Sequence, residues 1–305
     1  MPLISLLALL GLIVGLSVER KGFASPKLDR ILSKALVQLV YPCLLFSSLL
    51  LRFNWMEVKT FAIVPLSVFA VCATGLLYGK LSLGLSKLKQ DATKRSYVFL
   101  AMMPNYSFVP LVIAQAFWAD KGLALVALSS VGADFFLWTL AYPQIAGRRD
   151  WRKIFSPALI SLILALVLLK TEIDFPRSAW AGSLIFLSWI GKATLPLSMY
   201  VLGGQLAKAS RQASDTRAHQ LLLVWRLILC PLLMFGLILT LGRSLPYEAK
   251  AVLLLVGSMP GAVVTVVLAR LHEADGRFAA TQIFLGHCLG VISVSLWQGL
   301  LYWIL

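Results

Sequence analysis

Long runs of apolar residues dominate the chain, and short connectors that carry charged residues, proline or glycine separate them. A helix needs about 20 consecutive apolar residues to cross the hydrocarbon core of a bilayer. The runs predict ten membrane-spanning helices, at residues 2–18, 29–51, 59–83, 96–118, 122–146, 156–170, 179–206, 218–241, 248–270 and 278–304. The first run lacks the basic region and cleavage site of a signal peptide, and the sixth is short for a span. We therefore expect an all-α polytopic membrane protein without a separate soluble domain.

The composition supports this expectation. Apolar residues make up 59% of the 305 residues and charged residues 13%, with a mean hydropathy of +0.85. Average soluble proteins carry roughly 25% charged residues, so this chain has too little charge to cover a surface in water. Soluble enzymes, disulfide scaffolds and disordered chains are excluded. The four cysteines lie in apolar runs without a C-x-x-C pair, which predicts neither a disulfide framework nor a metal site.

The net charge of +15 arises from 28 Lys and Arg residues against 13 Asp and Glu. In a soluble protein this excess would suggest nucleic acid, but basic residues that flank membrane spans fix their orientation, so we expect no nucleic-acid partner. The odd-numbered connections carry Arg20, Lys21, Lys27, Arg30, Lys34, Lys80, Lys87, Lys89, Lys94, Arg95, Arg148, Arg149, Arg152, Lys153, Lys208, Arg211, Arg217, Arg270 and Arg277. The even-numbered connections carry only Arg52, Lys59, Lys121, Lys170, Arg177, Arg243 and Lys250. Because positive connections stay in the cytoplasm, both termini are expected on the non-cytoplasmic side of a plasma or bacterial inner membrane.

The two halves of the chain resemble one another at a nearly constant offset. The matching pairs, in order, are Leu3-Ile4-Ser5 with Leu159-Ile160-Ser161, Pro42 with Pro196, Met103-Pro104 with Met259-Pro260, and Leu137-Trp138 with Leu296-Trp297. We therefore predict two repeats, at residues 1–147 and 154–305. Since each holds five spans, an odd number, the repeats are inverted relative to one another. This is a transporter architecture, whose substrate site lies near the bilayer midplane where broken helices meet.

Pro104 and Pro260 fall in the middle of the fourth and ninth spans. Proline removes a backbone donor and clashes with the preceding turn, so it kinks or breaks a helix. A break within a bilayer persists only where protein or a water-filled cavity satisfies the freed groups. A single proline of this kind would most simply be a harmless kink. A pair in corresponding spans of two repeats predicts two broken helices that cross at a binding site.

Three segments carry a family resemblance: MMPNYSFVPLVIAQAF in the fourth span, KATLPLSMYVLGGQLAKA in the seventh and VGSMPGAVVTVVLARL in the ninth. In order and spacing they resemble the auxin efflux carrier family of membrane transporters, over essentially the whole chain. The resemblance implies a ten-helix fold with crossed broken helices 4 and 9, shared with bile-acid symporters and some sodium/proton antiporters. It also implies a scaffold of helices 1, 2, 6 and 7, which pairs protomers in a homodimer, and a mobile transport domain of helices 3–5 and 8–10.

The substrates that this resemblance implies are small organic anions, such as auxin or the dicarboxylates malate and malonate. The short, basic fifth connection GRRDWRKIF is similar to that of prokaryotic members. The chain departs from the family in the ninth helix. An asparagine often stands four residues after the proline, but here that position is Val264, followed by Thr265. The fourth-helix asparagine, Asn105, is retained.

Broken helices present unpaired N–H groups and a positive dipole end, which attract anions. Asn105 follows Pro104 and is expected to donate its amide to a substrate carboxylate; its alternative role is to cap the second half-helix. Gly261 would alternatively let two backbones approach closely. The full set of predicted substrate-binding residues is Pro104, Asn105, Tyr106, Ser107, Pro260, Gly261 and Thr265.

Among the ionisable residues in predicted spans, four are singled out: Asp134, His287, Lys192 and Arg226. An acid at the bilayer centre costs roughly 2.5–3.5 kcal/mol, so Asp134 is either used for proton or cation coupling or hydrogen-bonded between helices in its protonated form. His287 is a further candidate for coupling, with a structural role as the alternative. Lys192 is expected to pair with an acid or to guide an anion inward. Arg226, near a span end, is expected to snorkel to the cytoplasmic face.

These observations predict a secondary transporter that exports or exchanges small organic anions. The alternative is a sodium-coupled bile-acid-type symporter or a cation/proton antiporter of the same fold. An enzyme is not predicted, because the chain shows no nucleophile–base pair, phosphate-binding loop or metal-binding motif. We expect no cofactor, and as partners only the anion, the lipid bilayer and a second copy of the chain.

Overall fold

The computed structural model describes residues 3–23, 25–147, 155–207 and 216–305. The regular elements of these residues are helices: α1 (Leu3–Arg20), α2 (Pro26–Ala35), η1 (Leu36–Val40), α3 (Tyr41–Arg52), α4 (Trp55–Thr60), α5 (Ile63–Ser86), α6 (Asp91–Met102), α7 (Phe108–Phe136), η2 (Leu137–Ala141), α8 (Tyr142–Ala146), α9 (Pro157–Leu169), η4 (Phe175–Arg177), α10 (Ala181–Lys192), α11 (Thr194–Ala207), α12 (Thr216–Val224), η5 (Trp225–Leu229), α13 (Cys230–Thr240), α14 (Tyr247–Gly257), α15 (Val264–Leu271) and α16 (Gly276–Ile304). The first residue of the first predicted span (Pro2), the start of the second predicted repeat (residue 154) and several basic residues (Arg148, Arg149, Arg152, Lys153, Lys208 and Arg211) lie outside the described residues.

The helices follow the predicted apolar runs closely. Within the described ranges, six stretches are long and apolar enough to cross a membrane by length and composition: Ile31–Arg52, Trp55–Ser86, Phe108–Ala146, Ala181–Gly204, Thr216–Thr240 and Gly276–Ile304. The predicted short sixth run is the apolar helix α9. The fourth run is interrupted after the 12-residue helix α6, and the ninth run is divided into α14, with 11 residues, and α15, with 8. Neither run therefore forms one continuous helix. The protein is thus an all-helical membrane protein, and the count of ten spans stays a prediction.

The outer surface is apolar where the long helices face outward. Trp189 of α10 is 70% exposed, and Val291 and Leu296 of α16 are 70% and 69% exposed. Large apolar side chains in such numbers on the outside of a molecule mark a surface that contacts lipid or another protein rather than water. This surface is the structural counterpart of the low charge of the sequence.

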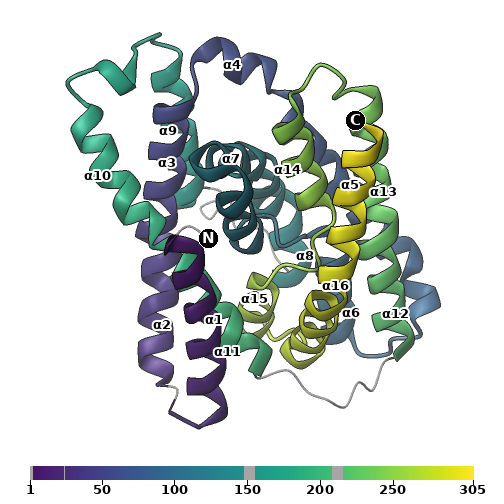
Figure 1. Ribbon diagram of the computed structural model, residues 1–305. Coiled ribbons are helices and arrows are strands. Elements are labelled where there is room, and N and C mark those ends of the chain that lie inside the picture. Colours follow the sequence, from purple (N-terminus) through teal and green to yellow (C-terminus); the bar gives the residue numbers. More distant parts are fainter. Residues whose placement is uncertain (1–2, 24, 148–154, 208–215) are drawn as a thin grey trace.

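The helices pack in two groups on either side of α7 (Figure 1). One group, which we call the left group, holds α1 to α3 and α9 to α11; α1 packs along α11, and α3 packs against α9 and α10. The other, the right group, holds α5, α6 and α12 to α16. Glycines allow the close contact of α1 with α11: a Cβ at Gly15 would collide with the Tyr200 carbonyl, and one at Gly203 with the Leu12 carbonyl. Small residues at such positions let membrane helices approach closely.

Helix α7 contains a sharp turn within its length. Ala119 has φ 49° and ψ −138°, values outside the helical region. A residue with a side chain seldom adopts a positive φ, so the chain reverses here rather than bending gently. The turn lies in the predicted connection between the fourth span (96–118) and the fifth (122–146).

The predicted breaks are confirmed. Helix α6 ends at Met102 and α7 begins at Phe108, on either side of Pro104. Helix α14 ends at Gly257 and α15 begins at Val264, on either side of Pro260. Both breaks are buried, and they meet one another at Pro104 and Gly261.

Candidate functional site

The two breaks cross and bond to one another through their backbones. Pro104 and Gly261 form an antiparallel bridge. The Asn105 N–H donates to the Pro260 carbonyl at 2.8 Å, and the Ala262 N–H donates to the Met103 carbonyl at 3.0 Å. Each break therefore satisfies polar groups that the other has freed, which is what a non-helical segment inside a membrane requires.

The end of α6 at the crossing is held by two side chains from η5. Trp225 Nε1 donates to the Ala101 carbonyl at 2.7 Å, and Arg226 Nε donates to the Leu100 carbonyl at 3.0 Å. The last carbonyls of a helix lack intrahelical partners and carry its negative partial charge. The expectation that Arg226 snorkels to the cytoplasmic face is wrong: the side chain is 1% exposed, because the broken helix offers these carbonyls in the interior.

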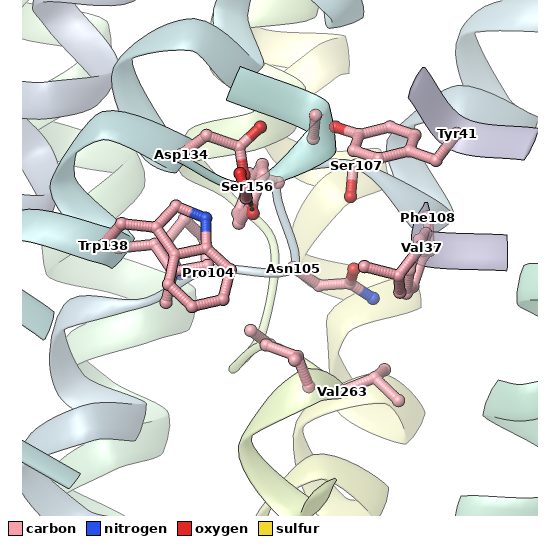
Figure 2. Close-up of a pocket in the computed structure, with 15 residues that line it drawn as sticks. Val37, Tyr41, Pro104, Asn105, Ser107, Phe108, Asp134, Trp138, Ser156 and Val263 are labelled. Carbon is pink, nitrogen blue, oxygen red and sulfur yellow. Dashed lines mark hydrogen bonds between the residues drawn. The ribbon is translucent and has the colours of Figure 1, made fainter. Parts of the chain in front are cut away.

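A pocket opens beside the crossing, and we call it the crossing pocket (Figure 2). It is lined by Val37, Tyr41, Pro104, Asn105, Tyr106, Ser107, Phe108, Asp134, Leu137, Trp138, Ser156, Ala158, Ala262, Val263 and Val264. These residues come from both helix groups, with η1, α3 and α9 on one side and the two breaks on the other. The pocket therefore lies at the boundary between the left and right groups.

Three helices begin at this pocket. Ser107 is the N-cap residue of α7 and Ser156 that of α9, and Val264 is the first residue of α15. Helix N-termini present N–H groups and a positive partial charge, so their convergence favours an anion. Capping of α7 by Asn105, its alternative predicted role, is not what the structure shows: Ser107 holds that position, and the Asn105 amide bonds elsewhere.

Asp134 reaches the pocket from α7 and is 3% exposed. The Tyr106 hydroxyl donates to Asp134 Oδ1 at 2.6 Å. Its second oxygen, Oδ2, has no hydrogen-bond partner within the part of the chain that the structure describes. Asp134 is thus buried, and its hydroxyl partner comes from the break itself.

His287 of α16 contacts Asn105 of the fourth-helix break but does not line the crossing pocket. The Asn105 amide nitrogen lies 3.1 Å from His287 Nε2, and His287 Nδ1 lies 2.8 Å from the Ile283 carbonyl oxygen. His287 also lines a second pocket, which we call the aromatic pocket. Its lining is Val109, Ile113, Phe117, Trp118, Tyr247, Leu255, Met259, Pro260, His287, Gly290, Val291, Val294, Ser295, Gln298 and Tyr302.

Two predicted site residues lie apart from this constellation. Lys192 Nζ forms an ion pair with Asp120 Oδ1 at 3.1 Å, and Arg52 contacts the other oxygen of Asp120 at 2.6 Å. Lys192 thus pairs with an acid, as one of its two predicted roles requires. Thr265 is fully buried in α15 and lines neither pocket. The structure brings together Pro104, Asn105, Tyr106, Ser107 and Asp134 at the crossing pocket, while Pro260 lines the aromatic pocket and Gly261 forms the bridge.

Sequence reasoning missed the aromatic wall of the crossing pocket. Tyr41 precedes Pro42, and Trp138 belongs to the pair Leu137-Trp138, so both lie at or beside positions that match between the two repeats. Neither was assigned to the site, because an aromatic residue in an apolar run gives no sign of which way it faces. Ser156, followed by Pro157, carries the ordinary signature of a helix start, which could have placed the α9 N-terminus but not its position at the crossing.

Comparison with known proteins gives the family. The model of the Membrane transport protein family matches residues 1–154 and again residues 144–298. The chain belongs to this family. The predicted resemblance to the auxin efflux carriers, which this family contains, is thereby confirmed.

Two relatives bear names of the same kind. An uncharacterized transporter of Methanocaldococcus jannaschii is 26% identical over 310 residues, with 97% of each chain covered. An uncharacterized transporter of Methanothermobacter thermautotrophicus is 26% identical over 281 residues, covering 88% of this chain and 87% of the relative. The protein is a multi-pass membrane transporter of this family.

Proposed function

We propose that the protein is a secondary transporter of small organic anions and that the anion binds in the crossing pocket. The observation that carries the proposal is the convergence of three helix N-termini on one pocket between two broken helices. The Asn105 amide adds a side-chain donor at the same place. A site near the crossing of broken helices is the common arrangement in secondary transporters.

The pocket lining favours a monocarboxylate with an apolar or aromatic body. Tyr41, Phe108 and Trp138 provide rings, and Val37 and Val263 provide aliphatic surface. Among the described residues that line the pocket, none carries a positive charge. A second carboxylate would therefore lack a cationic partner, so we expect auxin-like acids to bind more tightly than malate or malonate.

We further propose that transport is of the elevator type. The right group, with the breaks, would move against the left group, and the pocket would change its access at their boundary. The position of the pocket between the groups supports this proposal. The ten-span inverted repeat belongs to the same proposal, and the separate matches of the family model to the two halves support it. Both termini would lie outside the cytoplasm, and the homodimer rests on family resemblance.

A cation-linked mechanism is the second candidate. The observation that favours it is Asp134 Oδ2, a buried carboxylate oxygen that no other described side chain or backbone group bonds. Such an oxygen would suit a hard cation such as sodium, since hard cations take oxygen ligands. Uptake into proteoliposomes with and without a sodium gradient separates the two functions. Strict sodium dependence would favour the symporter of the bile-acid type.

The direct test of the anion proposal is equilibrium binding of labelled auxin, malate and malonate to the purified protein. We expect saturable binding of auxin and weaker binding of the dicarboxylates. Trp138→Ala should weaken auxin binding by up to about tenfold, since a ring–ring contact contributes about 0.5–1.5 kcal/mol. The matched control is Trp189→Ala, because Trp189 is 70% exposed on the outer surface. If the folded protein binds none of the three acids, the proposal is wrong.

A further inference from the structure

The contacts of His287 define its protonation state in this structure. The Ile283 carbonyl can only accept a hydrogen bond, so the neighbouring Nδ1 carries the hydrogen. The Asn105 amide nitrogen can only donate, so Nε2 presents its lone pair. The neutral imidazole with hydrogen on Nδ1 satisfies both contacts, and the imidazolium does not, because its Nε2–H would face another donor.

This bond also decides what Asn105 offers to the crossing pocket. One of the two N–H groups of the amide is committed to His287, which leaves the carbonyl oxygen Oδ1 and at most one N–H for a ligand. If His287 gains a proton on Nε2, the amide must rotate so that Oδ1 accepts from it. Both N–H groups are then released toward the pocket. Protonation thus converts Asn105 from a mixed donor and acceptor into a double donor, which is what a carboxylate requires.

The charge balance of the site points the same way. Asp134 contributes an acid to the pocket, and the described lining residues contribute no Lys or Arg. An anion placed there meets only the partial charges of helix ends, and burying an unpaired charge is costly. A buried imidazolium alone is equally unfavourable. The anion and the proton neutralise one another when both are present, so each favours the binding of the other.

We propose that His287 is the coupling residue: one proton binds to His287 with each anion, and Asn105 relays the change to the crossing pocket. This inference rests on the proposed anion site. His287 acts as a positioning residue, because it reaches the anion only through Asn105. It lines the aromatic pocket and not the crossing pocket, so the proton and the anion would reach the Asn105–His287 bond from different pockets.

Other titratable groups near His287 are accounted for. Tyr247 of α14 and Tyr302 share the aromatic pocket with it. Three charged residues on elements packed against α16 have partners elsewhere. Arg95 of α6 donates to three carbonyls, and Arg226 of η5 donates to the Leu100 carbonyl. Glu248 of α14 forms an ion pair with Lys121. Arg217 of α12 and Arg270 of α15 stand at or near the ends of their helices, as do Asp91 and Lys94 of α6. His219 of α12 lies 2.7 Å from Gln282 of α16 and lines neither pocket. Asp134, across the break, lines the crossing pocket and could take the proton in place of His287.

The test is titration calorimetry of the full-length protein with auxin, malate and malonate. Each titration is repeated in two buffers of different ionisation enthalpy at about pH 7.5, which is above the ordinary pKa of imidazole. The difference in heat gives the number of protons taken up. We expect uptake of about one proton per anion, and an affinity that falls about tenfold for each further pH unit, as linkage requires.

Three variants locate the proton. His287→Gln should still bind anion, with no proton uptake and an affinity independent of pH, because the glutamine side chain does not titrate. Asp134→Asn should retain the uptake. His272→Gln is the matched control: the sequence has three histidines, and this one bonds to Tyr142 away from the crossing, so its uptake should equal that of the wild type.

The outcomes separate the coupling from the anion site. Anion binding without proton uptake in the wild type would overturn the coupling and leave the proposed function standing. Uptake that persists in His287→Gln would overturn the role of His287. If that uptake is lost in Asp134→Asn, the proton belongs to Asp134. Absence of anion binding in the folded wild type would overturn the proposed function, and the coupling with it.

Discussion

At the residue scale, the two breaks are chemically unequal. Asn105 places an amide beside the fourth-helix break, whereas Val264, which also lines the crossing pocket, places an aliphatic group beside the ninth. The ninth helix then offers its N-terminal N–H groups and dipole, while the Thr265 hydroxyl is buried away from the pocket lining. The affinity for a carboxylate should therefore depend much more on one break than on the other.

Replacing these two residues tests this asymmetry. Asn105→Ala should weaken anion binding about ten- to a hundredfold, since a hydrogen bond to a charged group contributes roughly 1.5–3 kcal/mol. Val264→Ala should change it little, and Val264→Asn should increase affinity for carboxylates. Calorimetric titration of the purified variants measures all three. Equal, small effects at positions 105 and 264 would move the site away from the crossing.

A second residue-scale prediction concerns Arg226. Arg226→Met leaves the Leu100 carbonyl without its buried donor and should lower the free energy of unfolding by about 1–3 kcal/mol. The control is Arg243→Met, because the Arg243 guanidinium also donates Nε to a carbonyl, that of Leu239, but in an exposed position. Thermal unfolding in detergent compares the two. Equal stability of both variants would show that Arg226 does not hold the end of α6.

The sequence could predict which residues stand at the crossing but not which of them bond. Prolines mark breaks locally, so Pro104 and Pro260 were found from their own positions. Asn105 and His287 lie far apart in the chain, and so do Leu100 and Arg226. Their contacts follow from how α6, η5 and α16 pack, which no local pattern encodes. The location of Arg226 was predicted wrongly for this reason. Its partner, the Leu100 carbonyl, is free to accept a hydrogen bond only because α6 ends there.

At the scale of elements, α16 depends on glycine to pack against the ninth-helix break. A Cβ added at Gly286 would lie 2.7 Å from Pro260 Cβ. Gly286→Ala should therefore push α16 from the break and lower the free energy of unfolding by about 1–3 kcal/mol, the usual cost of overpacking. It should also weaken anion binding, because the same shift moves His287.

Gly299→Ala is the matched control on the same helix, since a Cβ there meets no atom within 4 Å. Alanine favours a helix over glycine by about 0.8–1 kcal/mol, so this variant should be as stable as the wild type or slightly more so. Thermal unfolding monitored by intrinsic fluorescence measures both. Equal stability of the two variants would contradict the close contact of α16 with the break.

Helix positions were largely predictable from the apolar runs, and the interruptions within them were only partly so. The runs at 156–170 and 278–304 correspond closely to α9 and α16. The reversal at Ala119 falls in a predicted connection, and the π-helical turns η1, η2 and η5 each precede a helix whose second residue is proline: Pro42, Pro143 and Pro231. Proline lacks a backbone N–H and clashes with the preceding turn, so local sequence contributes to these departures from the α-helix, although the π-helical geometry itself was not predicted.

At the scale of the whole molecule, Asp120 joins the turn within α7 to two helices of the left group. Arg52 ends α3 and Lys192 ends α10, and both form ion pairs with the Asp120 carboxylate. Asp120→Asn should lower the free energy of unfolding by about 0.5–2 kcal/mol at low ionic strength, the sum of two partly exposed pairs. The difference should shrink at high salt, where exposed charges are screened.

Asp91→Asn is the control for this prediction. The Asp91–Lys94 pair lies within one helix, and the Asp91 side chain is 91% exposed, so its removal should have little effect at any salt concentration. Melting temperatures of both variants at low and high ionic strength make the comparison. An Asp120→Asn variant as stable as the wild type in both conditions would mean that these ion pairs do not hold α7 to α3 and α10.

The proposed function requires that an anion binds in the crossing pocket, at the boundary of the two helix groups. The most direct measurement is an experimental structure of the protein in lipid with auxin, or with whichever of the tested carboxylates binds most tightly. We predict density for the carboxylate beside the Asn105 amide, with the body of the ligand between Tyr41 and Trp138. Ligand density in the aromatic pocket or on the outer surface, with an empty crossing pocket, would contradict the account.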